Sequence, residues 1–289
     1  MDKILFGDNQ FFGVNHMSEE KARQQAMRFQ DLDEIMRVLE AARDLGAGGF
    51  MCTTHDRIAD VCERIRAEPR KWQGFNLYPG MPYAHKYANA VTELGYFDAL
   101  RKFLPKDGFV DTLLRGSKAI ATQDMKAIIG LLVDAEMKMF DGLPTPVIFL
   151  QNVVTDLVIG LGSVDAFAAF SEHVRKKYAA EPGFITMNVP KLLPLLDAAG
   201  IESPIVCANV NKIGFRMSGG IEGYRRAAER YSPRVIAMSI FASGALAPRE
   251  AIEWVLDEPY VQSIVFGASS RRNIETTINL IREKLGEFA

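Results

Sequence analysis

Short apolar runs alternate along this chain with longer stretches that have the spacing of amphipathic helices. Each run ends at a glycine or a polar residue, and most runs are followed by a helix pattern. Apolar runs of this length are typical of strands that are buried on both faces of a parallel sheet. The sequence therefore predicts eight parallel strands, at residues 4–7, 49–54, 74–78, 147–152, 184–188, 205–210, 235–240 and 264–266.

The segments between these runs carry their apolar residues on one side of a helix. In the clearest case Asp31 is a suitable N-cap, Leu32, Ile35 and Leu39 form an apolar stripe, and Gly46 ends the pattern. Helices between consecutive strands are what parallel pairing requires. The same spacing predicts further helices near residues 56–67, 167–178, 190–199, 221–231, 249–257 and 274–285.

The alternation of strands and helices predicts one α/β domain, a single (β/α)8 or TIM barrel, over residues 1–289. A doubly wound open sheet is the alternative, but no GxGxxG sequence follows the first strand. Between the third and fourth strands, Pro79 to Pro144 predicts a long helical insert. The apolar residues of this insert suit packing on the barrel, and they equally suit a lid or a contact between subunits.

Composition and charge narrow the classes of partner. The chain has 34 basic and 36 acidic residues, a net charge of -2 and no long run of one charge, which argues against nucleic acid or a membrane surface. No stretch resembles a signal peptide or a membrane span. Three cysteines without CxxC spacing favour a reduced, cytoplasmic protein. A small-molecule substrate is the expected partner, and the sequence sets no oligomeric state.

The active site of a (β/α)8 barrel lies at the carboxyl ends of its strands, so the residues that end each run are the candidates for chemistry. Most of them here are amides and hydroxyls. Asp8 follows the first strand, His55 the second and Asn152 the fourth, and we predict these three as the catalytic residues. Asp56 is suited to orient His55 as an acid or base, although the same pair also fits the start of a helix.

The strand ends also hold residues that other chemistries would use: a metal site, a Schiff-base lysine or a cysteine nucleophile. His16, His55 and His85 follow three successive strands, but their spacing matches no metal motif, so no metal site is predicted. Lys212 lies beyond the sixth strand, where it is either the Schiff-base lysine of an aldolase or, more plainly, an exposed loop lysine. Cys52 has no neighbouring base and is predicted to be a buried thiol.

The last strand passes through a turn of small residues, 267–270, into a helix that begins with Arg271 and Arg272. Backbone N–H groups at a helix N-terminus, two hydroxyls and two positive charges are what a phosphate group needs. The alternative is a plain N-cap by Ser270 with two solvated arginines. The local sequence leaves both interpretations open.

Two segments near the C-terminus, VIAMSIFASGAL (235–246) and VQSIVFGASSRRNIETTI (261–278), resemble the last two strands of the aldo-keto reductase family. In that family a turn of the type SPLAxGxL precedes a strand that ends in GAS and leads into a helix. The segment FITMNVPKLLPLL (184–196) resembles the family's fifth-strand segment. The resemblance implies a barrel that binds NADP. It implies cofactor contacts from Ser239, Phe241, Gly244 and Leu246 at the pyrophosphate, and from Gly267, Ser269, Ser270, Arg271 and Arg272 toward the adenosine phosphate.

The family's catalytic Asp, Tyr, Lys and His have no counterparts at the matching positions. Where the family has DTAxxY, this chain has CTTHDR, so Cys52 replaces the Asp and Arg57 the Tyr. The lysine position falls at residues 77–78 and the histidine position at residues 151–152, where neither residue type occurs. Carbonyl reduction needs a proton donor beside the oxygen that gains charge, and Tyr78 or Tyr83 is the available substitute.

The sequence thus predicts an aldo-keto-reductase-like barrel enzyme that acts on a small polar or phosphorylated metabolite. With the family's cofactor retained, the enzyme is an atypical NADP-dependent oxidoreductase. A cofactor-independent lyase or isomerase that uses His55 and Asp8 is the main alternative. A barrel that binds a ligand without catalysis is the third.

Overall fold

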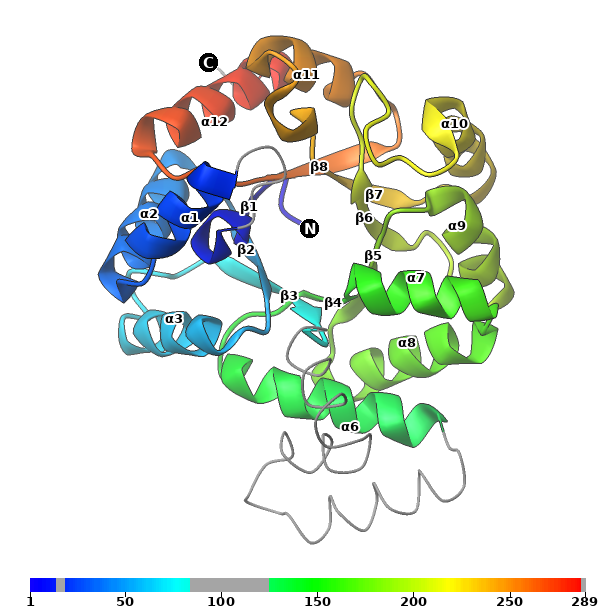
Figure 1. Ribbon diagram of the computed structural model, residues 1–289. Helices are drawn as coiled ribbons and strands as arrows, with labels where there is room; N and C mark the ends of the chain where they lie inside the picture. The colour runs from blue at the N-terminus through cyan, green and yellow to red at the C-terminus, as the bar shows by residue number, and fades with distance from the viewer. Residues whose placement is uncertain (14–18, 84–124, 287–289) are drawn as a thin grey trace, which may run out of the picture.

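Eight parallel strands form a closed barrel in chain order in the computed structural model, which describes residues 1–13, 19–83 and 125–286 (Figure 1). A ladder between the last strand and the first closes the barrel. The predicted (β/α)8 barrel is therefore confirmed. Its strands are β1 (Ile4–Gly7), β2 (Gly49–Thr53), β3 (Asn76–Met81), β4 (Val147–Leu150), β5 (Glu181–Thr186), β6 (Ile205–Asn209), β7 (Arg234–Met238) and β8 (Val261–Phe266).

Helices surround the barrel (Figure 1). The helix α2 (Leu32–Leu45) begins after Asp31, whose side chain accepts a hydrogen bond from the N–H of Asp33, and it ends at Gly46, as predicted. The other described helices are α1 (Glu19–Arg28), α3 (Asp56–Ala67), α6 (Met125–Met137), α7 (Asn152–Leu161), α8 (Val164–Tyr178), α9 (Val189–Ala198), α10 (Gly220–Tyr231), α11 (Pro248–Leu256) and α12 (Arg271–Leu285), with the 3-10 turns η1 (Asn9–Phe12), η2 (Lys138–Phe140) and η3 (Ala242–Gly244).

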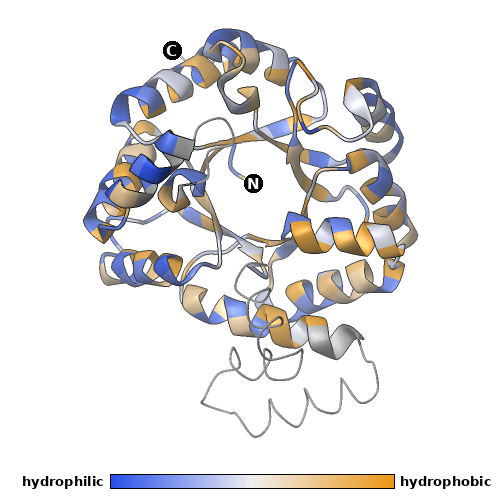
Figure 2. Ribbon diagram, viewed as in Figure 1, coloured by the Kyte–Doolittle hydropathy of each residue, from blue (hydrophilic) through white to orange (hydrophobic). Residues whose placement is uncertain are grey.

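The helix α7 was not predicted, and part of it was assigned to the fourth strand. Its inner side packs on the core through Val154, Val158 and Ile159. Its outer side is apolar as well, because Val153, Leu157 and Leu161 are exposed (Figure 2). A helix that is apolar on both sides lacks the polar face by which an amphipathic helix is recognised in a sequence.

The helical insert predicted between the third and fourth strands is only partly described. Residues 84–124 lie outside the described residues, and the end of the insert forms α6 and η2. The helix α1 lies between β1 and α2, in a segment for which no helix was predicted. Within the described part of the chain, no helix combines the length and apolar character needed to cross a membrane.

The third strand runs further than predicted. It covers Asn76–Met81, whereas the Pro79–Gly80 pair predicted its end. Pairing with β4 begins only at Gly80, and proline, which has no N–H, is tolerated where the pairing of a strand is incomplete. As a result, Tyr83 follows almost directly at the carboxyl end of the barrel.

Side chains of the strands alternate between the interior of the barrel and the layer under the helices, as the two-residue period of a strand requires. The interior is filled mainly by large apolar side chains, and the outer layer forms the larger core. Packing of this kind makes the barrel a solid core rather than a pore. The buried interior cluster consists of Leu5, Met51, Tyr78, Val147, Phe149, Ile205, Cys207, Ile236 and Val265.

The amino end of the barrel is closed by Tyr78. Its hydroxyl donates to Oδ2 of Asp2 at 2.5 Å and accepts a hydrogen bond from the N–H of Asp2 at 3.0 Å. A Cβ atom at Gly49 would lie 2.5 Å from Cε2 of Tyr78, so glycine is needed beside the ring. Tyr78 therefore lies at the end of the barrel opposite to the expected active site and is not the substitute proton donor.

Polar contacts outside the barrel join α6 to α8. The carboxylate of Asp134 lies 2.7 Å from Nε2 of His173, and it accepts hydrogen bonds from Nζ of Lys177 and the hydroxyl of Tyr178, both at 2.6 Å. Burial alone would raise the pKa of Asp134, but these contacts outweigh burial and lower the pKa to about 2. The ionised form of Asp134 thus stabilises the packing of the two helices.

We expect Asp134→Asn to lower the free energy of unfolding by about 1 to 2 kcal/mol near pH 7, after allowance for partial solvent exposure. The stabilisation is present above the pKa of an unfolded aspartate, about 3.9, and is lost as the pH falls toward the folded pKa of about 2. Urea unfolding between about pH 7 and 3 should therefore show the gap between wild type and variant closing in acid. Lys176→Gln, which removes an exposed ion pair with Glu172 on α8, is the control and should have little effect. A pH-independent gap would contradict the prediction.

Candidate active site at the carboxyl end of the barrel

Asp8 and Thr53 join the carboxyl ends of β1 and β2. Oδ2 of Asp8 accepts hydrogen bonds from the backbone N–H of Thr53 at 2.7 Å and from its hydroxyl at 2.8 Å. The strand register explains the contact. Gly7 of β1 pairs with Met51 of β2, so the residues that follow them, Asp8 and Thr53 among them, lie side by side at the rim of the barrel. Asp8 is only 6% exposed. A buried carboxylate held by neutral donors is therefore part of the barrel mouth.

The pKa of Asp8 is raised above its ordinary value. Burial is the main cause, because removal from water disfavours the charged form, and the hydrogen bonds from Thr53 oppose it. Perturbed carboxyl groups at the carboxyl ends of barrel strands are candidates for proton transfer. Asp8 thus has both the position and the electrostatic character expected of a functional residue.

Three aromatic rings, from the loops after β1, β2 and β3, pack in a row beside Asp8. The ring centroid of His55 lies 4.4 Å from that of Phe12 and 5.5 Å from that of Tyr83, the second pair being close to edge-to-face. His55 and Tyr83 are both half-buried. We refer to Asp8, Thr53, His55 and Tyr83 as the strand-end cluster.

The backbone fixes the orientation of the His55 imidazole. His55 is the N-cap of α3, and its Nδ1 accepts a hydrogen bond from the N–H of Arg57 at 3.1 Å. A ring nitrogen that accepts a hydrogen bond carries no proton, so the neutral imidazole holds its proton on Nε2. The two interpretations of the sequence, helix cap and site residue, are therefore compatible in His55.

Asn152, the third predicted catalytic residue, is the first residue of α7 and is half-buried. It follows β4, which is separated from β1 by two strands of the barrel. No hydrogen bond within the described part of the chain connects it to Asp8. The structure thus brings two of the three predicted residues, Asp8 and His55, into one cluster.

Several other strand-end side chains hold loops in place. The amide of Asn211 donates to the carbonyl of Phe215 at 2.9 Å and accepts from its N–H at 2.7 Å. Nζ of Lys212 pairs with Glu250 at 2.7 Å on the surface, so a loop ion pair replaces the Schiff-base interpretation. Cys52 is buried, as predicted, and burial raises the pKa of its thiol.

The loop after β7 contains serines in the left-handed backbone conformation. Ser239 and Ser243 have φ values of 54° and 60°, in the left-handed region that residues other than glycine rarely adopt. The N–H of Ala242 donates to the carbonyl of Ser239 at 2.9 Å. The loop thus presents a fixed backbone at the barrel mouth, beside the turn that follows β8. Of the cofactor residues predicted here, Ser239, Phe241 and Leu246 are half-buried and Gly244 is exposed.

The turn after β8 is backed by the segment that follows β1. A Cβ atom at Gly267 would lie 2.2 Å from Oε1 of the buried Gln10, so any larger residue would displace that side chain. Arg28, at the end of α1, donates from Nη1 to the carbonyl of Ser269 at 2.7 Å. Sequence reasoning missed this contact, because it joins residues 241 positions apart and no local pattern marks it.

The helix α12 begins on this turn with Ser270 as its N-cap, whose Oγ accepts a hydrogen bond from the N–H of Asn273 at 3.3 Å. Ser270 is therefore the N-cap of α12, which the anion-site interpretation of the turn allows as well. Arg271 and Arg272 lie in the first turn and are exposed. Their guanidinium groups form no ion pair within the described residues, so they are available to a phosphate at the positive end of the helix dipole.

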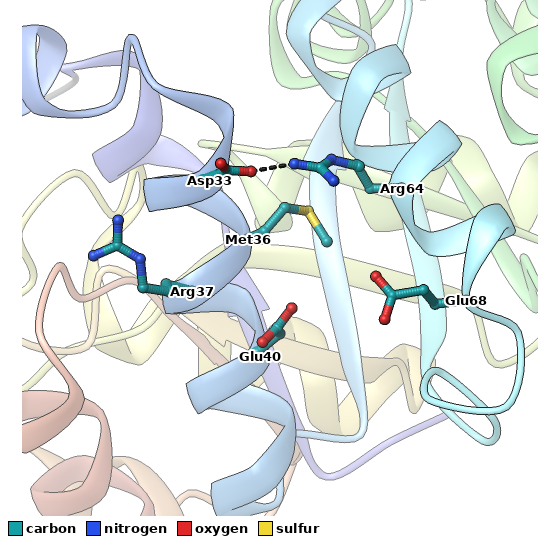
Figure 3. A pocket seen from close by; sticks show the side chains of 6 residues that line it. All are labelled: Asp33, Met36, Arg37, Glu40, Arg64 and Glu68. Carbon is teal, nitrogen blue, oxygen red and sulfur yellow. Dashed lines mark hydrogen bonds and ion pairs between the residues drawn. The ribbon is translucent and has the colours of Figure 1, made fainter.

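A groove of about 220 Å³ lies between α2 and α3, among the helices outside the barrel (Figure 3). Asp33 and Arg64 form an ion pair across it, and Glu40 pairs with Lys71 at 2.6 Å. Because most of its charges are already paired, we place the candidate site at the barrel mouth and not in this groove. The side chains that line it are Asp33, Met36, Arg37, Glu40, Arg64 and Glu68.

The histidines considered as metal ligands are only partly described, because His16 and His85 lie outside the described residues. Within the described ranges no group of three His, Cys, Asp or Glu side chains is placed to hold a metal ion.

Thr53 and Tyr83 complete the cluster around Asp8 and His55, and their place in it follows from the pairing of β1, β2 and β3 rather than from a sequence motif.

No protein-family model and no curated protein matches the chain. Solved structures are similar in fold. A protein from Pseudomonas aeruginosa assigned to the aldo-keto reductases is 13% identical, with a TM-score of 0.63 over 98% of this chain and 90% of that one. An aldo-keto reductase from Bacillus halodurans, solved in its holo form, is 13% identical, with a TM-score of 0.56 over 99% and 92% of the two chains. A variant of Gox0644 in complex with NADPH is 11% identical, with a TM-score of 0.52 over 96% and 83%. The chain therefore has a (β/α)8 barrel similar in fold to that of the aldo-keto reductases.

Proposed function

We propose that this chain is an atypical NADP-dependent oxidoreductase that reduces the carbonyl group of a small polar or phosphorylated metabolite. The observation that carries the proposal is the strand-end cluster. It places a buried carboxyl group, a hydroxyl, an imidazole and a phenol at the carboxyl ends of β1, β2 and β3. In a barrel of this fold, that is where substrates react. Asn152 then serves to bind the substrate from the far side of the mouth.

The residues after β7 and β8 fit the phosphate groups of a dinucleotide. The first turn of α12 offers backbone N–H groups, a favourable dipole and two exposed guanidinium groups, and Gly267 is exposed on the approach. A protein of similar fold was solved with NADPH, which supports the choice of cofactor. Bound NADPH would supply the hydride for carbonyl reduction.

A cofactor-independent lyase or isomerase is the second candidate. The observation that favours it is that Asp8, whose pKa is raised by burial, and His55, whose imidazole is held by the N–H of Arg57, lie at the carboxyl ends of neighbouring strands. Such a pair can move protons without any hydride transfer. Titration of the protein with NADPH and NADP+, followed by calorimetry, separates the two: micromolar binding supports the oxidoreductase, and no binding at millimolar cofactor leaves the lyase or isomerase.

We expect the double substitution Arg271→Ala and Arg272→Ala to weaken NADPH binding more than tenfold. Charge-assisted contacts to a phosphate contribute about 1.5–3 kcal/mol, and the loss should be largest at low salt. The matched control is Arg226→Ala with Arg230→Ala, which removes two exposed arginines from α10 and leaves the turn after β8 intact. Equal affinities for the two double variants would show that Arg271 and Arg272 are plain solvated residues.

Asp8→Asn is expected to reduce turnover at least a hundredfold while raising the thermal midpoint near neutral pH. The folded pKa of Asp8 is raised, so below the unfolded pKa of about 3.9 its carboxyl group is protonated in both states and does not lower the stability. As the pH rises from there toward the folded pKa, the free energy of unfolding of the wild type falls. The stability gain of Asp8→Asn should therefore vanish in acid. Differential scanning calorimetry and NADPH oxidation with methylglyoxal measure the two effects.

The comparison variant is Asp8→Ala. It leaves the N–H and hydroxyl of Thr53 without their acceptor, and should cost roughly 1–3 kcal/mol of stability. An Asp8→Asn variant that keeps full turnover would reduce Asp8 to a structural residue.

A further inference from the structure

The loop between β6 and α10 brings an arginine to the mouth of the barrel. Asn209, the last residue of β6, follows Ile205 and Cys207 in the alternation of the strand, so its side chain faces the barrel interior. Asn209 is only 1% exposed, and its amide donates to the carbonyl of Arg216 at 3.0 Å. The backbone of Arg216 is therefore held directly at the carboxyl end of β6.

Further hydrogen bonds fix the loop on both sides of Arg216. Before it, the buried Asn211 donates to the carbonyl of Phe215 at 2.9 Å and accepts from its N–H at 2.7 Å. After it, the N–H of Ser218 donates to the carbonyl of Met187, beyond β5, at 3.0 Å. The side chain of Arg216 thus extends from a backbone whose path is set before any ligand binds, which lowers the entropy cost of binding.

Arg216 has a backbone conformation that an arginine rarely adopts. Its φ is 55°, in the left-handed region, and the same loop uses glycine at its other such positions, Gly214, Gly219 and Gly220. Every other described residue with a left-handed φ is glycine, alanine or serine. A turn alone would be more stable with glycine here. A strained, large side chain at the barrel mouth indicates that the side chain itself is used.

The interior of the barrel is partly exposed beside this loop. Ile185, near the carboxyl end of β5, and Met238, the last residue of β7, pack on the interior cluster and are half-buried. Ile185 pairs with Cys207 in the strand register, and Met238 pairs with Asn209. The strands on both sides of β6 therefore form an apolar floor next to Arg216.

We propose that Arg216 binds the anionic group of the substrate, a phosphate or a carboxylate, and so sets the substrate class of the site. The inference rests on the proposed function, whose substrates become small carbonyl compounds that carry an oxyanion. A guanidinium has paired N–H donors and a permanent charge that fit two oxygens of either group. Arg216 is exposed, and its Cζ lies 5.4 Å from the ring centroid of Phe215. Lys212, the other cation of the loop, is paired with Glu250.

The position of Arg216 suits a substrate that spans the mouth. In the closed barrel, three strands separate β6 from β2 in either direction, so Arg216 and the strand-end cluster lie on opposite sides. A substrate held by its anion at Arg216 extends its carbonyl group across the apolar floor toward Asp8 and His55. The phosphates of the dinucleotide are assigned to the first turn of α12, so the two anion sites are distinct.

The first test measures binding without turnover. Glycerol 3-phosphate and glycerate carry the two anions, and glycerol is their neutral counterpart. Calorimetry without cofactor should show saturable binding of at least one anion and none of glycerol, with a more than tenfold loss of affinity in Arg216→Gln. Lys212→Gln, the matched control from the same loop, should bind as the wild type does. Repeating the titrations in the Arg271→Ala, Arg272→Ala background keeps anion binding at α12 out of the result.

The second test separates use of the side chain from the shape of the loop. Arg216→Gly removes the guanidinium and relieves the left-handed φ. It should raise the thermal midpoint by about 1–2 °C and lose anion affinity as Arg216→Gln does. An Arg216→Gly variant with a lower midpoint assigns the side chain to the structure of the loop and overturns the proposal.

Turnover with NADPH then separates the two proposals. Glyceraldehyde 3-phosphate and tartronate semialdehyde are aldehydes that carry the two anions, and glyceraldehyde is neutral. Arg216→Gln should lower kcat/KM at least tenfold for the preferred anionic aldehyde and leave that for glyceraldehyde unchanged. A wild-type protein that binds neither anion, or an Arg216→Gln variant with wild-type values, overturns the role of Arg216 and leaves the oxidoreductase intact. Anion binding that depends on Arg216, in a protein that does not bind NADPH, overturns the proposed function and leaves the anion site.

Discussion

Closure of the barrel between β8 and β1 is the constraint on which the candidate site depends. The register pairs Ile4 with Ile264 and Phe6 with Phe266, which places the segment after β1 between the ends of β2 and β8. That segment contacts both neighbours, through the bond of Asp8 to Thr53 on one side and the bond of Arg28 to Ser269 on the other. One connection therefore links the strand-end cluster to the turn proposed to hold a phosphate. An open sheet would leave β1 and β8 at opposite edges, and the two regions would not meet.

The fold was predictable because burial on both faces leaves a strong signal in each strand. Apolar runs bounded by glycine or polar residues marked all eight strands, although several boundaries moved by a few residues. The signal fails where tertiary packing overrides the local pattern. Pro79 lies inside β3 because the ladder to β4 starts only at Gly80, and α7 escaped prediction because its outer residues Val153, Leu157 and Leu161 are apolar and exposed.

The candidate site was predictable only as a set of positions. Asp8 and His55 follow strands, and the barrel rule alone brings them to the same end. Which of the strand-end residues meet depends on register and loop path, so the bond from Thr53 to Asp8 and the packing of Tyr83 on His55 appear only in three dimensions. Ser270 shows a different limit. A cap and an anion site use the same backbone geometry, so the sequence of the turn cannot separate them.

Two of the carboxylates that are buried in the described part of the chain, Glu258 and Asp8, are held in different ways, and the contrast favours a functional role for Asp8. Glu258 is 4% exposed and receives two hydrogen bonds from the guanidinium of Arg225, at 3.0 Å and 2.5 Å. A carboxylate kept for structure is expected to have such a partner, because an unpaired buried charge is costly. Asp8 is buried to a similar degree, yet within the described residues its hydrogen bonds come from the neutral groups of Thr53 and from no cation. Burial of Asp8 therefore opposes stability, and a fold tolerates such a cost most readily where the raised pKa serves proton transfer at the mouth of the barrel.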